Sequence, residues 1–557
     1  MKNIVICQIN SKYIHSSLAA WCILAGIRKY CESRVSASVC EGTVNESEEA
    51  IAARISEKSP DIVGFSSYIW NIGAVEKTAL AIKRERPETV IILGGPEVSY
   101  SPVKALENFS FADFIVCGEG EYPFARLADA VAEGKDVSDI PGIAYRKDRE
   151  IFAAEPYLPS DIPPSPYTRE YFDALRGRIA YLETSRGCPY SCAFCLSGRC
   201  GKMRFFPEER AKKELLMLAG TGTKTVKLVD RTFNADRRRA DRFYSFISEN
   251  YGTRIPSGVR VHFEISAKLL DDESFETIKR LPRGAVQFEV GIQSFNKRTL
   301  AAISRDTDVE TAEQKTRRLI SLGNVHVHTD LIAGLPFEDY SSFAESFNRA
   351  FAMRPQMLQL GFLKILSGSE MGDENYPYKC VFSLEPPYEV RSTEWLSERD
   401  ISRLRIIEDL NDRLYNSGRF INTLDLLLAS SGKTPFELYE KLADSLRYGE
   451  KTGLDDFTKL FFEACLNFDG VDKKAVFDAL VCDRLSSVAD GRLPPFLKTD
   501  YEKTAELKKR LLAEKPELYS KGVKRAIAYL SSQGRGVYVN YNKLPDPVTG
   551  RYEIEYV

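Results

Sequence analysis

The stretch TSRGCPYSCAFCLSGR, residues 184–199, is the most informative part of this 557-residue chain. It contains Cys188, Cys192 and Cys195 in a C-x3-C-x2-C spacing, directly after the strand-like segment IAYLETS. Three thiolates suit a [4Fe–4S] cluster that keeps one iron open. A structural zinc site normally has four ligands, and Cys200 is the nearest candidate for the fourth. We therefore expect an iron–sulfur cluster, with zinc or inert thiols as the alternatives.

The residues that follow the cysteines alternate between strand-like and helix-length segments. Strand-like patterns occur at IAYLETS, TVKLVD, VHFEIS, AVQFEVGI, VHVHTDLIAG and MLQLGFLKIL. Six such units predict a partial (β/α)6 barrel over residues 173–375, in which functional side chains gather at the C-terminal ends of the strands.

Two further regions flank the predicted barrel. Residues 1–155 alternate short Val and Ile runs with helical patterns, which predicts a parallel, doubly wound, Rossmann-like domain. Residues 156–172 are rich in proline and predict a linker. Residues 376–557 have mostly helical periodicity, end in a hairpin-like alternation around Asp546–Gly550, and carry no readable motif. We expect an α/β protein with a mostly α-helical C-terminal domain.

Composition limits the classes of protein to which the chain can belong. Hydrophobic residues make up 43% and charged residues 28%, and the net charge of -2 argues against a protein that coats nucleic acid. The first residues lack the pattern of a signal peptide, and no apolar run reaches the roughly 18 residues of a membrane span. Twelve cysteines in a reducing compartment are expected to be buried thiols or metal ligands. We expect a cytoplasmic protein without membrane contact.

The cysteine array resembles the signature of the radical S-adenosylmethionine superfamily, and the likeness extends from about Tyr167 to Met371. The resemblance implies that the open iron binds the amino and carboxylate groups of S-adenosylmethionine. One electron from the cluster, supplied by an external donor of the flavodoxin or ferredoxin type, then cleaves the sulfonium to give a 5′-deoxyadenosyl radical. Phe194 matches the family's aromatic residue before the third cysteine, whose backbone meets the adenine.

The other strand ends match the same superfamily by position. LVDRTFN, HFEIS and FEVGIQS follow the cysteines in the order of the family's second, third and fourth strands, and DLIAGLP resembles the fifth. The resemblance implies cofactor or substrate contacts for residues in the first three of these segments. They are Asp230, Asn234, Glu264, Glu289 and Gln293.

The first domain resembles the cobalamin-binding domains that precede many radical S-adenosylmethionine cores. PDIVGFSSYIWN, VIILGGPEVSY and ADFIVCGEGE carry this likeness. Glycines at strand ends let the backbone approach a flat ligand, and serines can bond corrin amides or a nucleotide tail. The expected contacts are Ser66, Ser67, Gly94, Gly95, Gly118, Glu119 and Gly120. A plain Rossmann-like domain is the alternative.

The cobalt ligand is a separate question, because the family's D-x-H-x-x-G motif is missing from this sequence. His15 lacks the Asp and Gly partners of that motif, so we expect a packed or backbone-bonded histidine there. The related subgroup binds cobalamin without a histidine. We therefore expect the loop Tyr68, Ile69, Trp70 and Asn71 to face cobalt.

Together these resemblances imply a cobalamin-dependent methylase that transfers a methyl group to a carbon of its substrate. A different radical reaction that uses cobalamin without methyl transfer is one alternative, and a cobalamin or redox sensor is another. The segment YEKTAELKKRLLAEKPELYSKGVKR predicts a mildly basic helix pair that can lie on RNA or be a solvated face. RNA nucleosides, small metabolites and peptides thus stay open, and we expect the C-terminal domain to select among them.

Overall fold

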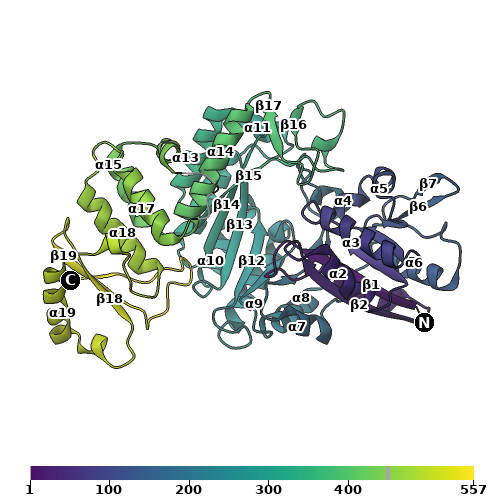
Figure 1. Ribbon diagram of the computed structural model, residues 1–557, viewed down its shortest axis with the longest axis horizontal. Helices are drawn as coiled ribbons and strands as arrows, with labels where there is room; N and C mark the ends of the chain where they lie inside the picture. Colours follow the sequence, from purple (N-terminus) through teal and green to yellow (C-terminus); the bar gives the residue numbers. More distant parts are fainter. Residues whose placement is uncertain (1, 447–448, 450–451) are drawn as a thin grey trace. The chain divides into compact units, whose positions relative to one another are not determined.

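The computed structural model describes residues 2–446, 449 and 452–557 (Figure 1). The chain forms two compact units. The first unit contains residues up to 265, with 303–305 and 363–391, and the second contains 266–302, 306–362 and 392–557. Among the described residues, no helix is long and apolar enough to cross a bilayer.

The first domain of unit 1 is a seven-stranded sheet in the order β2-β1-β3-β4-β5-β6-β7. Its strands β1 to β5 are parallel, so the predicted doubly wound, Rossmann-like fold is confirmed. The strands are β1 (Lys2–Asn10), β2 (Val35–Thr43), β3 (Ile62–Ser66), β4 (Val90–Gly94), β5 (Phe114–Val116), β6 (Ile143–Lys147) and β7 (Glu150–Ala153). The helices are α1 (Ala19–Tyr30), α2 (Glu48–Ser56), α3 (Ile72–Glu85), α4 (Pro96–Ser99), α5 (Pro102–Asn108) and α6 (Glu121–Glu133).

Two features of this region were not expected from the sequence. The strands β6 and β7 form an antiparallel hairpin whose turn residues Asp148 and Arg149 both have positive φ, at 51° and 74°. That conformation matches the right-handed twist of a tight hairpin. The helix α7 (Arg169–Leu175) begins inside the predicted linker, because Thr168 caps it by accepting a hydrogen bond from Tyr171 N.

The six predicted barrel strands are all present, with three in each unit, and all the pairs within a unit are parallel. Unit 1 holds β8 (Ala180–Leu182), β11 (Thr225–Leu228), β12 (Arg260–Ile265), α8 (Glu208–Ala219) and α9 (Arg237–Asn250). Unit 2 holds β13 (Val286–Gln293), β14 (His326–Ala333), β15 (Met357–Phe362), α10 (Asp272–Lys279), α11 (Lys297–Ala302), α12 (Val309–Ser321) and α13 (Tyr340–Ala352). The short strands β16 (Cys380–Phe382) and β17 (Val390–Thr393) follow.

The C-terminal region is mostly helical, as predicted, and it belongs to the same compact unit as β13 to β15. Its helices are α14 (Glu398–Asn411), α15 (Ile421–Ser431), α16 (Pro435–Ser445), α17 (Leu454–Cys465), α18 (Lys473–Ser487) and α19 (Tyr501–Glu514). Asn411 and Asn416 each donate an amide hydrogen bond to Leu358 O on β15, and Asn416 Oδ1 accepts one from Leu358 N. Side chains thus satisfy the backbone of β15 at this position.

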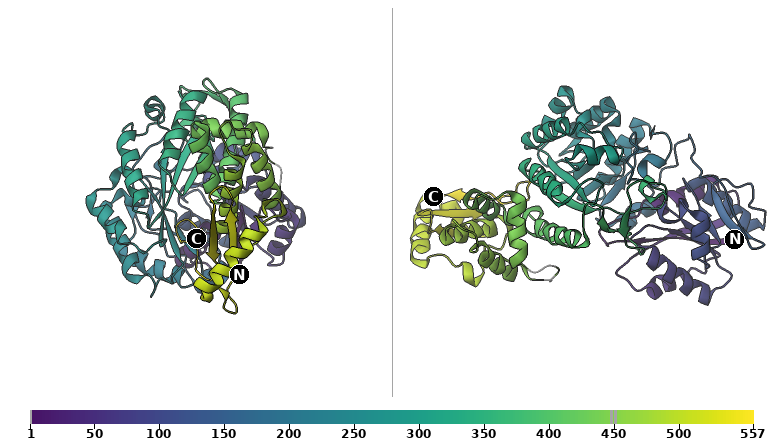
Figure 2. Two further views of the ribbon diagram at one scale, coloured as in Figure 1. Left: turned by 90° about the vertical axis from the view of Figure 1, so that its left-hand side faces the viewer. Right: turned by 90° about the horizontal axis from the view of Figure 1, so that it is seen from above.

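Two details of the C-terminal prediction need correction. The expected helix pair is one helix, α19, followed by a short 3-10 turn, because Lys515 leaves the helical conformation directly before Pro516. The expected hairpin is part of a three-stranded antiparallel sheet of β18 (Arg525–Leu530), β19 (Arg535–Asn540) and β20 (Glu555–Tyr556). Figure 2 shows these strands in yellow beside α19, whose Leu507 and Leu511 share a hydrophobic cluster with Tyr538.

Candidate active site

The three cysteines lie on one connection, residues 187–203, which we call the cluster loop. This loop joins β9 (Ser185–Arg186) to β10 (Arg204–Phe205), and the two strands pair antiparallel with Arg186 opposite Arg204. Its two ends are therefore held side by side. The first cysteine follows directly after β8 and β9, as the sequence predicted.

The thiols are only partly buried, so a metal group can reach them. Cys192 Sγ accepts a hydrogen bond from an Arg305 guanidinium nitrogen at 3.4 Å, and Cys188 Sγ lies 3.5 Å from Thr232 Oγ1. Burial raises the pKa of Cys192, whereas Arg305 acts in the opposite direction. Three accessible thiols on one short loop form a donor set that fits an iron–sulfur cluster.

Two distant segments hold the backbone between Cys192 and Cys195. Ala193 N donates to Ile303 O at 3.0 Å, and Met371 N donates to Ala193 O at 3.0 Å. Met371, the last residue of LKILSGSEM, is therefore bonded directly to the cluster loop.

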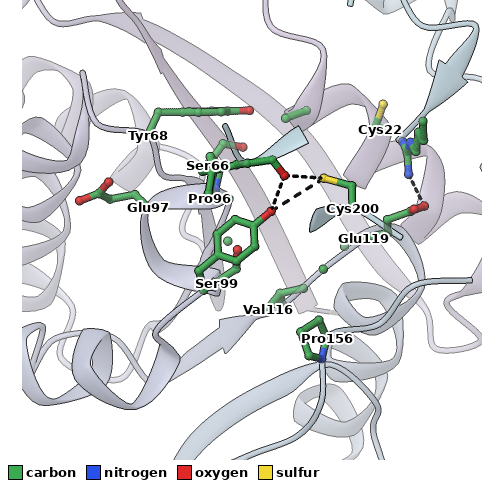
Figure 3. Close-up of a pocket in the computed structure, with 18 of the residues that line it drawn as sticks. Cys22, Ser66, Tyr68, Pro96, Glu97, Ser99, Val116, Glu119, Pro156 and Cys200 are labelled. Atoms are coloured by element: carbon green, nitrogen blue, oxygen red, sulfur yellow. Dashed lines mark hydrogen bonds and ion pairs between the residues drawn. The ribbon is translucent and has the colours of Figure 1, made fainter. Parts of the chain in front are cut away.

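A cavity of about 820 Å³ lies within unit 1, between the strand ends of the first domain and the cluster loop (Figure 3). It brings together many of the residues predicted from the two resemblances. These are Ser66, Tyr68, Ile69, Trp70, Gly94, Gly95, Gly118, Glu119, Gly120, Phe194 and Cys195. The cavity also has members that sequence reasoning did not select, among them Cys22, Tyr100, Glu183, Arg186 and Arg231.

The glycines of this cavity have different roles. A Cβ at Gly94 would find no atom closer than 3.8 Å, so its backbone is open to a ligand. A Cβ at Gly95 would lie 2.6 Å from Ser67 O, and one at Gly118 would lie 2.4 Å from Tyr157 O. Both residues also have positive φ, at 101° and 85°. Gly95 and Gly118 are therefore needed for the chain's own close packing, and only Gly94 shows the predicted open approach.

The loop after β3 presents aromatic side chains to the cavity. Tyr68 and Trp70 stack with their ring centroids 4.3 Å apart, and Trp70 is 49% exposed. The predicted members Ser67 and Asn71, although well described, lie outside the cavity lining. Asn71 is buried, where its amide donates to Ile9 O at 3.0 Å and to Ser66 O at 2.9 Å. It shapes the loop and does not face the cavity.

Asp230 supports the first barrel strand and lies outside the described cavity lining. Its carboxylate accepts hydrogen bonds from Thr184 N at 2.8 Å, Thr184 Oγ1 at 2.6 Å and Ser185 Oγ at 2.6 Å. Burial raises the pKa of Asp230 to about 6, although these hydrogen bonds act to lower it. The predicted pocket contact is thus a residue that fixes the start of β9. Asn234, four residues further along the chain, is buried and is likewise outside the described cavity lining.

Glu264, at the end of β12, pairs with two cations of the same unit. Its oxygens lie 4.0 Å from Lys227 Nζ and 3.7 Å from an Arg231 guanidinium nitrogen. Arg231 belongs to the cavity, whereas Glu264 is outside its described lining. Glu264 is thereby linked to the cavity through Arg231.

Glu289 and Gln293 lie on β13 in unit 2. Glu289 is opposite His328 in the strand register, with 3.9 Å between its oxygen and His328 Nδ1. His328 Nε2 lies 2.8 Å from Asp330 Oδ1, so the three side chains gather on one face of β13 and β14. Gln293 has φ of 72° at an irregularity in the β13 and β14 pairing. The predicted contacts of Glu289 and Gln293 with the cofactor or substrate remain predictions.

His15 and Cys200 are two further candidate ligands raised by the sequence, and their surroundings in the structure differ. His15 Nδ1 lies 2.7 Å from Tyr181 Oη, and its side chain is outside the described cavity lining. Burial lowers the pKa of His15. Cys200 lines the cavity, with Tyr100 Oη at 3.8 Å from its sulfur. Figure 3 places Cys200 among labelled first-domain residues such as Tyr68 and Glu119.

Comparison with known protein families assigns the three regions. Residues 5–128 match the family described as B12 binding domain, and residues 182–350 match the Radical SAM superfamily. The chain thus contains one segment similar to B12 binding domains and one similar to radical SAM domains. Residues 376–536 match a further family described as a protein of unknown function, DUF4080. The expected domain families are thereby confirmed.

Curated relatives support the same assignment. The chain is 30% identical over 313 residues to 2-(S-pantetheinyl)-carbapenam-3-carboxylate methyltransferase of Streptantibioticus cattleyicolor. The aligned region covers 53% of this chain and 45% of the relative. It is 30% identical over 302 residues to the cobalamin-dependent radical SAM methyltransferase TokK of Streptomyces tokunonensis, covering 51% and 44%. The chain thus spans less than half the length of these relatives.

Solved structures share the fold. OxsB, described as a cobalamin-dependent S-adenosylmethionine radical enzyme with aqua-cobalamin bound, is 16% identical with a TM-score of 0.57, covering 92% of this chain and 81% of OxsB. TsrM from Kitasatospora setae, with cobalamin and a [4Fe–4S] cluster bound, is 17% identical with a TM-score of 0.55, covering 67% and 74%. Identities at this level show likeness of fold alone.

Proposed function

We propose that this protein is a cobalamin-dependent radical SAM methyltransferase that transfers a methyl group to a carbon of its substrate. The observation that carries the proposal is the shared cavity of unit 1. Phe194 and Cys195 of the cluster loop line it together with Gly94 and Tyr68 of the B12 binding domain. A reaction that needs an iron–sulfur cluster, S-adenosylmethionine and cobalamin requires such a common space.

The dimensions and chemistry of the cavity fit that use. Its volume of about 820 Å³ is near the upper end of the ~300–1,000 Å³ that is usual for ligand sites. Gly94 leaves room for a flat ligand over the strand ends, and the cysteines leave thiols for iron. When bound, the cluster would supply the electron that cleaves S-adenosylmethionine and cobalamin would carry the methyl group.

The chain's own residues would bind, orient and exclude water. Tyr68 and Trp70 offer an aromatic wall at the face where the cobalt is expected. Arg231 brings a cation to the cavity, and Glu264 orients it. A largely apolar wall limits the contact of a carbon radical with solvent. An electron donor of the flavodoxin or ferredoxin type completes the proposal as an external partner in the cytoplasm.

Substrate class is the finer part of the proposal. The relatives include proteins named for a carbapenam carboxylate, a hopanoid and a tRNA nucleoside, so their substrates differ widely. Within the basic segment, the helix α19 interleaves its Lys and Arg residues with Glu. This surface gives RNA phosphates little net attraction. We therefore favour a small metabolite or peptide over RNA.

Anaerobic purification with reconstitution tests the proposal. We expect absorption and electron paramagnetic resonance spectra of both a [4Fe–4S] cluster and a corrin. An extract from a deletion strain, incubated with protein and methyl-labelled S-adenosylmethionine, should yield one labelled product. Formation of 5′-deoxyadenosine without label in any product would favour a non-methylating radical reaction. Cofactor binding without cleavage would favour a sensor.

A further inference from the structure

A buried ion cluster connects the cluster loop with the B12 binding domain. Arg186 lies 2.5 Å from a Glu119 oxygen, 2.6 Å from a Glu121 oxygen and 2.9 Å from a Glu183 oxygen. Arg204 contacts the other oxygen of Glu119. The five side chains are only 7% to 17% exposed, and we call them the Arg186 ion cluster.

The members of the Arg186 ion cluster come from two separate parts of the fold. Arg186 and Arg204 are opposite each other on β9 and β10, at the two ends of the cluster loop. Glu119 belongs to the turn between β5 and α6, and Glu121, on the other side of Gly120, is the first residue of α6. Both ends of the loop that carries the cysteines are thus tied to a single turn of the B12 binding domain.

The contacts are geometrically demanding. Arg186 engages both oxygens of Glu121 and both oxygens of Glu183, so its planar guanidinium is fixed in orientation. Burial raises the pKa of Glu119 despite Arg186 and Arg204, whereas for Glu121 the cost of burial is outweighed by Arg186 and the pKa is lowered. Three carboxylates face only two guanidiniums, so loss of either arginine would leave still more buried negative charge without a partner.

We propose that Arg186 and Arg204 are positioning residues that fix the cluster loop against the turn Gly118–Glu121. The cysteines and the strand ends of the B12 binding domain are thereby held at one separation across the cavity. The claim that this separation suits two cofactors rests on the proposed function. The claim that the two arginines fix the cluster loop rests only on the contacts described.

Hydrogen exchange of the full-length protein, prepared anaerobically, tests the inference. The variants are Arg186→Met, Arg186→Lys and Arg204→Met. We expect exchange at least about tenfold faster in peptides that cover 187–203 and 118–124 for Arg186→Met. Arg186→Lys should be intermediate because an ammonium cannot bridge the carboxylates in a planar fork, and Arg204→Met should be mildest.

Arg210→Met is the matched control. Arg210 is also a partly buried arginine of unit 1, bonded to Glu214 at 2.9 Å and to Pro163 O at 2.6 Å, but it contacts neither peptide through these bonds. Faster exchange confined to the two peptides supports the inference. Unchanged exchange overturns it. So does an increase that is spread over the whole chain, or one that Arg210→Met produces in the same two peptides.

Cofactor loading gives a second readout that separates this inference from the proposed function. Iron content should persist in Arg204→Met, because all three cysteines remain, while cobalamin affinity should fall about tenfold in Arg186→Met. Wild-type protein that takes up neither group would contradict the proposed function, yet the exchange result would still judge the Arg186 ion cluster. If the wild type takes up both groups and Arg186→Met binds cobalamin with unchanged affinity, only the inference is contradicted.

Discussion

The cavity side of unit 1 and the C-terminal region of unit 2 use buried polar groups in different ways. Around the cavity, loops after strands expose thiols, aromatic rings and an arginine to open space. In the C-terminal region, Asp483 is fully enclosed and accepts bonds from Asn422, Thr423 and Arg551. Open polar groups indicate chemistry, whereas enclosed and satisfied ones indicate support of the fold. Changes in the two regions should therefore have different consequences.

The largest effect should come from the cysteines, and it should leave the fold intact. Cys188→Ala, Cys192→Ala and Cys195→Ala each remove one thiolate from the donor set. We expect each variant to lose the cluster signal in electron paramagnetic resonance and all reductive cleavage of S-adenosylmethionine, with unchanged circular dichroism.

Cys200→Ala is the control, since Cys200 shares the cavity but lies outside the spacing of the three cysteines. It should keep both cluster and cleavage. A normal cluster in any of the three variants, or its loss in Cys200→Ala, would mean that the ligands are misassigned.

The second effect should fall on stability and spare the cluster. Asp483→Ala would leave Arg551 and the donors of Asn422 and Thr423 facing an empty site. We expect a loss of about 3–5 kcal/mol, the usual cost of removing one partner of a buried charge network. Asp455, 55% exposed and paired with Arg484 at 2.8 Å, is the matched site, where alanine should cost under about 1 kcal/mol. Thermal unfolding compares them, and equal losses would refute the distinction between the two regions.

The same comparison explains what the sequence could predict. Cys188, Cys192 and Cys195 are close together in the chain, so their spacing alone identified the cluster loop. Contacts such as Asn416 with Leu358 join residues far apart in the sequence, and no local pattern indicates them.

Other local predictions stay untested, because polarity alone does not say which way a side chain points. Asn71 was expected to face cobalt, yet it turns inward to bond Ile9 O and Ser66 O. Asp230 was expected in the pocket, yet it holds Thr184 and Ser185. Arg186, two residues before the first cysteine, was missed although it stands within the quoted motif.

The C-terminal region also changes the expectation for a truncated protein. If the C-terminal region only selects the substrate, a protein truncated after about Gly372 keeps slow cleavage of S-adenosylmethionine while product is lost. Asn411 and Asn416 satisfy Leu358 on β15, and Tyr415 Oη donates to Pro355 O at 2.5 Å. The truncation would therefore also expose a barrel strand, and point substitutions are the sharper test of the region's role.

A third, pH-dependent effect should arise in unit 2. Glu338 is buried, and its Oε1 accepts from Ser294 Oγ at 2.6 Å and Ser346 Oγ at 2.9 Å, while Oε2 has no partner within the described part of the chain. Burial raises the pKa of Glu338 to about 7. Because the folded protein holds this proton and the unfolded chain releases it near pH 4, stability should fall as pH rises from about 4 to 7.

The variant Glu338→Gln isolates this contribution, which is roughly 3 kcal/mol for a shift of this size. It keeps the oxygen that accepts from Ser294 and Ser346 but cannot ionise. We expect the difference in melting temperature between pH 5 and pH 8 to be smaller in the variant than in the wild type. An identical pH dependence would mean that Glu338 does not titrate in this range.

The smallest effect should come from α19, one face of which is exposed to solvent. Lys508, Lys509 and Arg510 are exposed, while Leu507 and Leu511 bury the opposite face. Along the helix the four cations are offset by three glutamates, so its net charge is only +1. We expect simultaneous reversal of Lys508, Lys509 and Arg510 to leave the melting temperature and the affinity for cell RNA unchanged at every salt concentration. If RNA is the substrate and α19 contacts its phosphates, the same reversal should weaken binding and flatten its salt dependence, because each lost phosphate contact removes the release of a counterion.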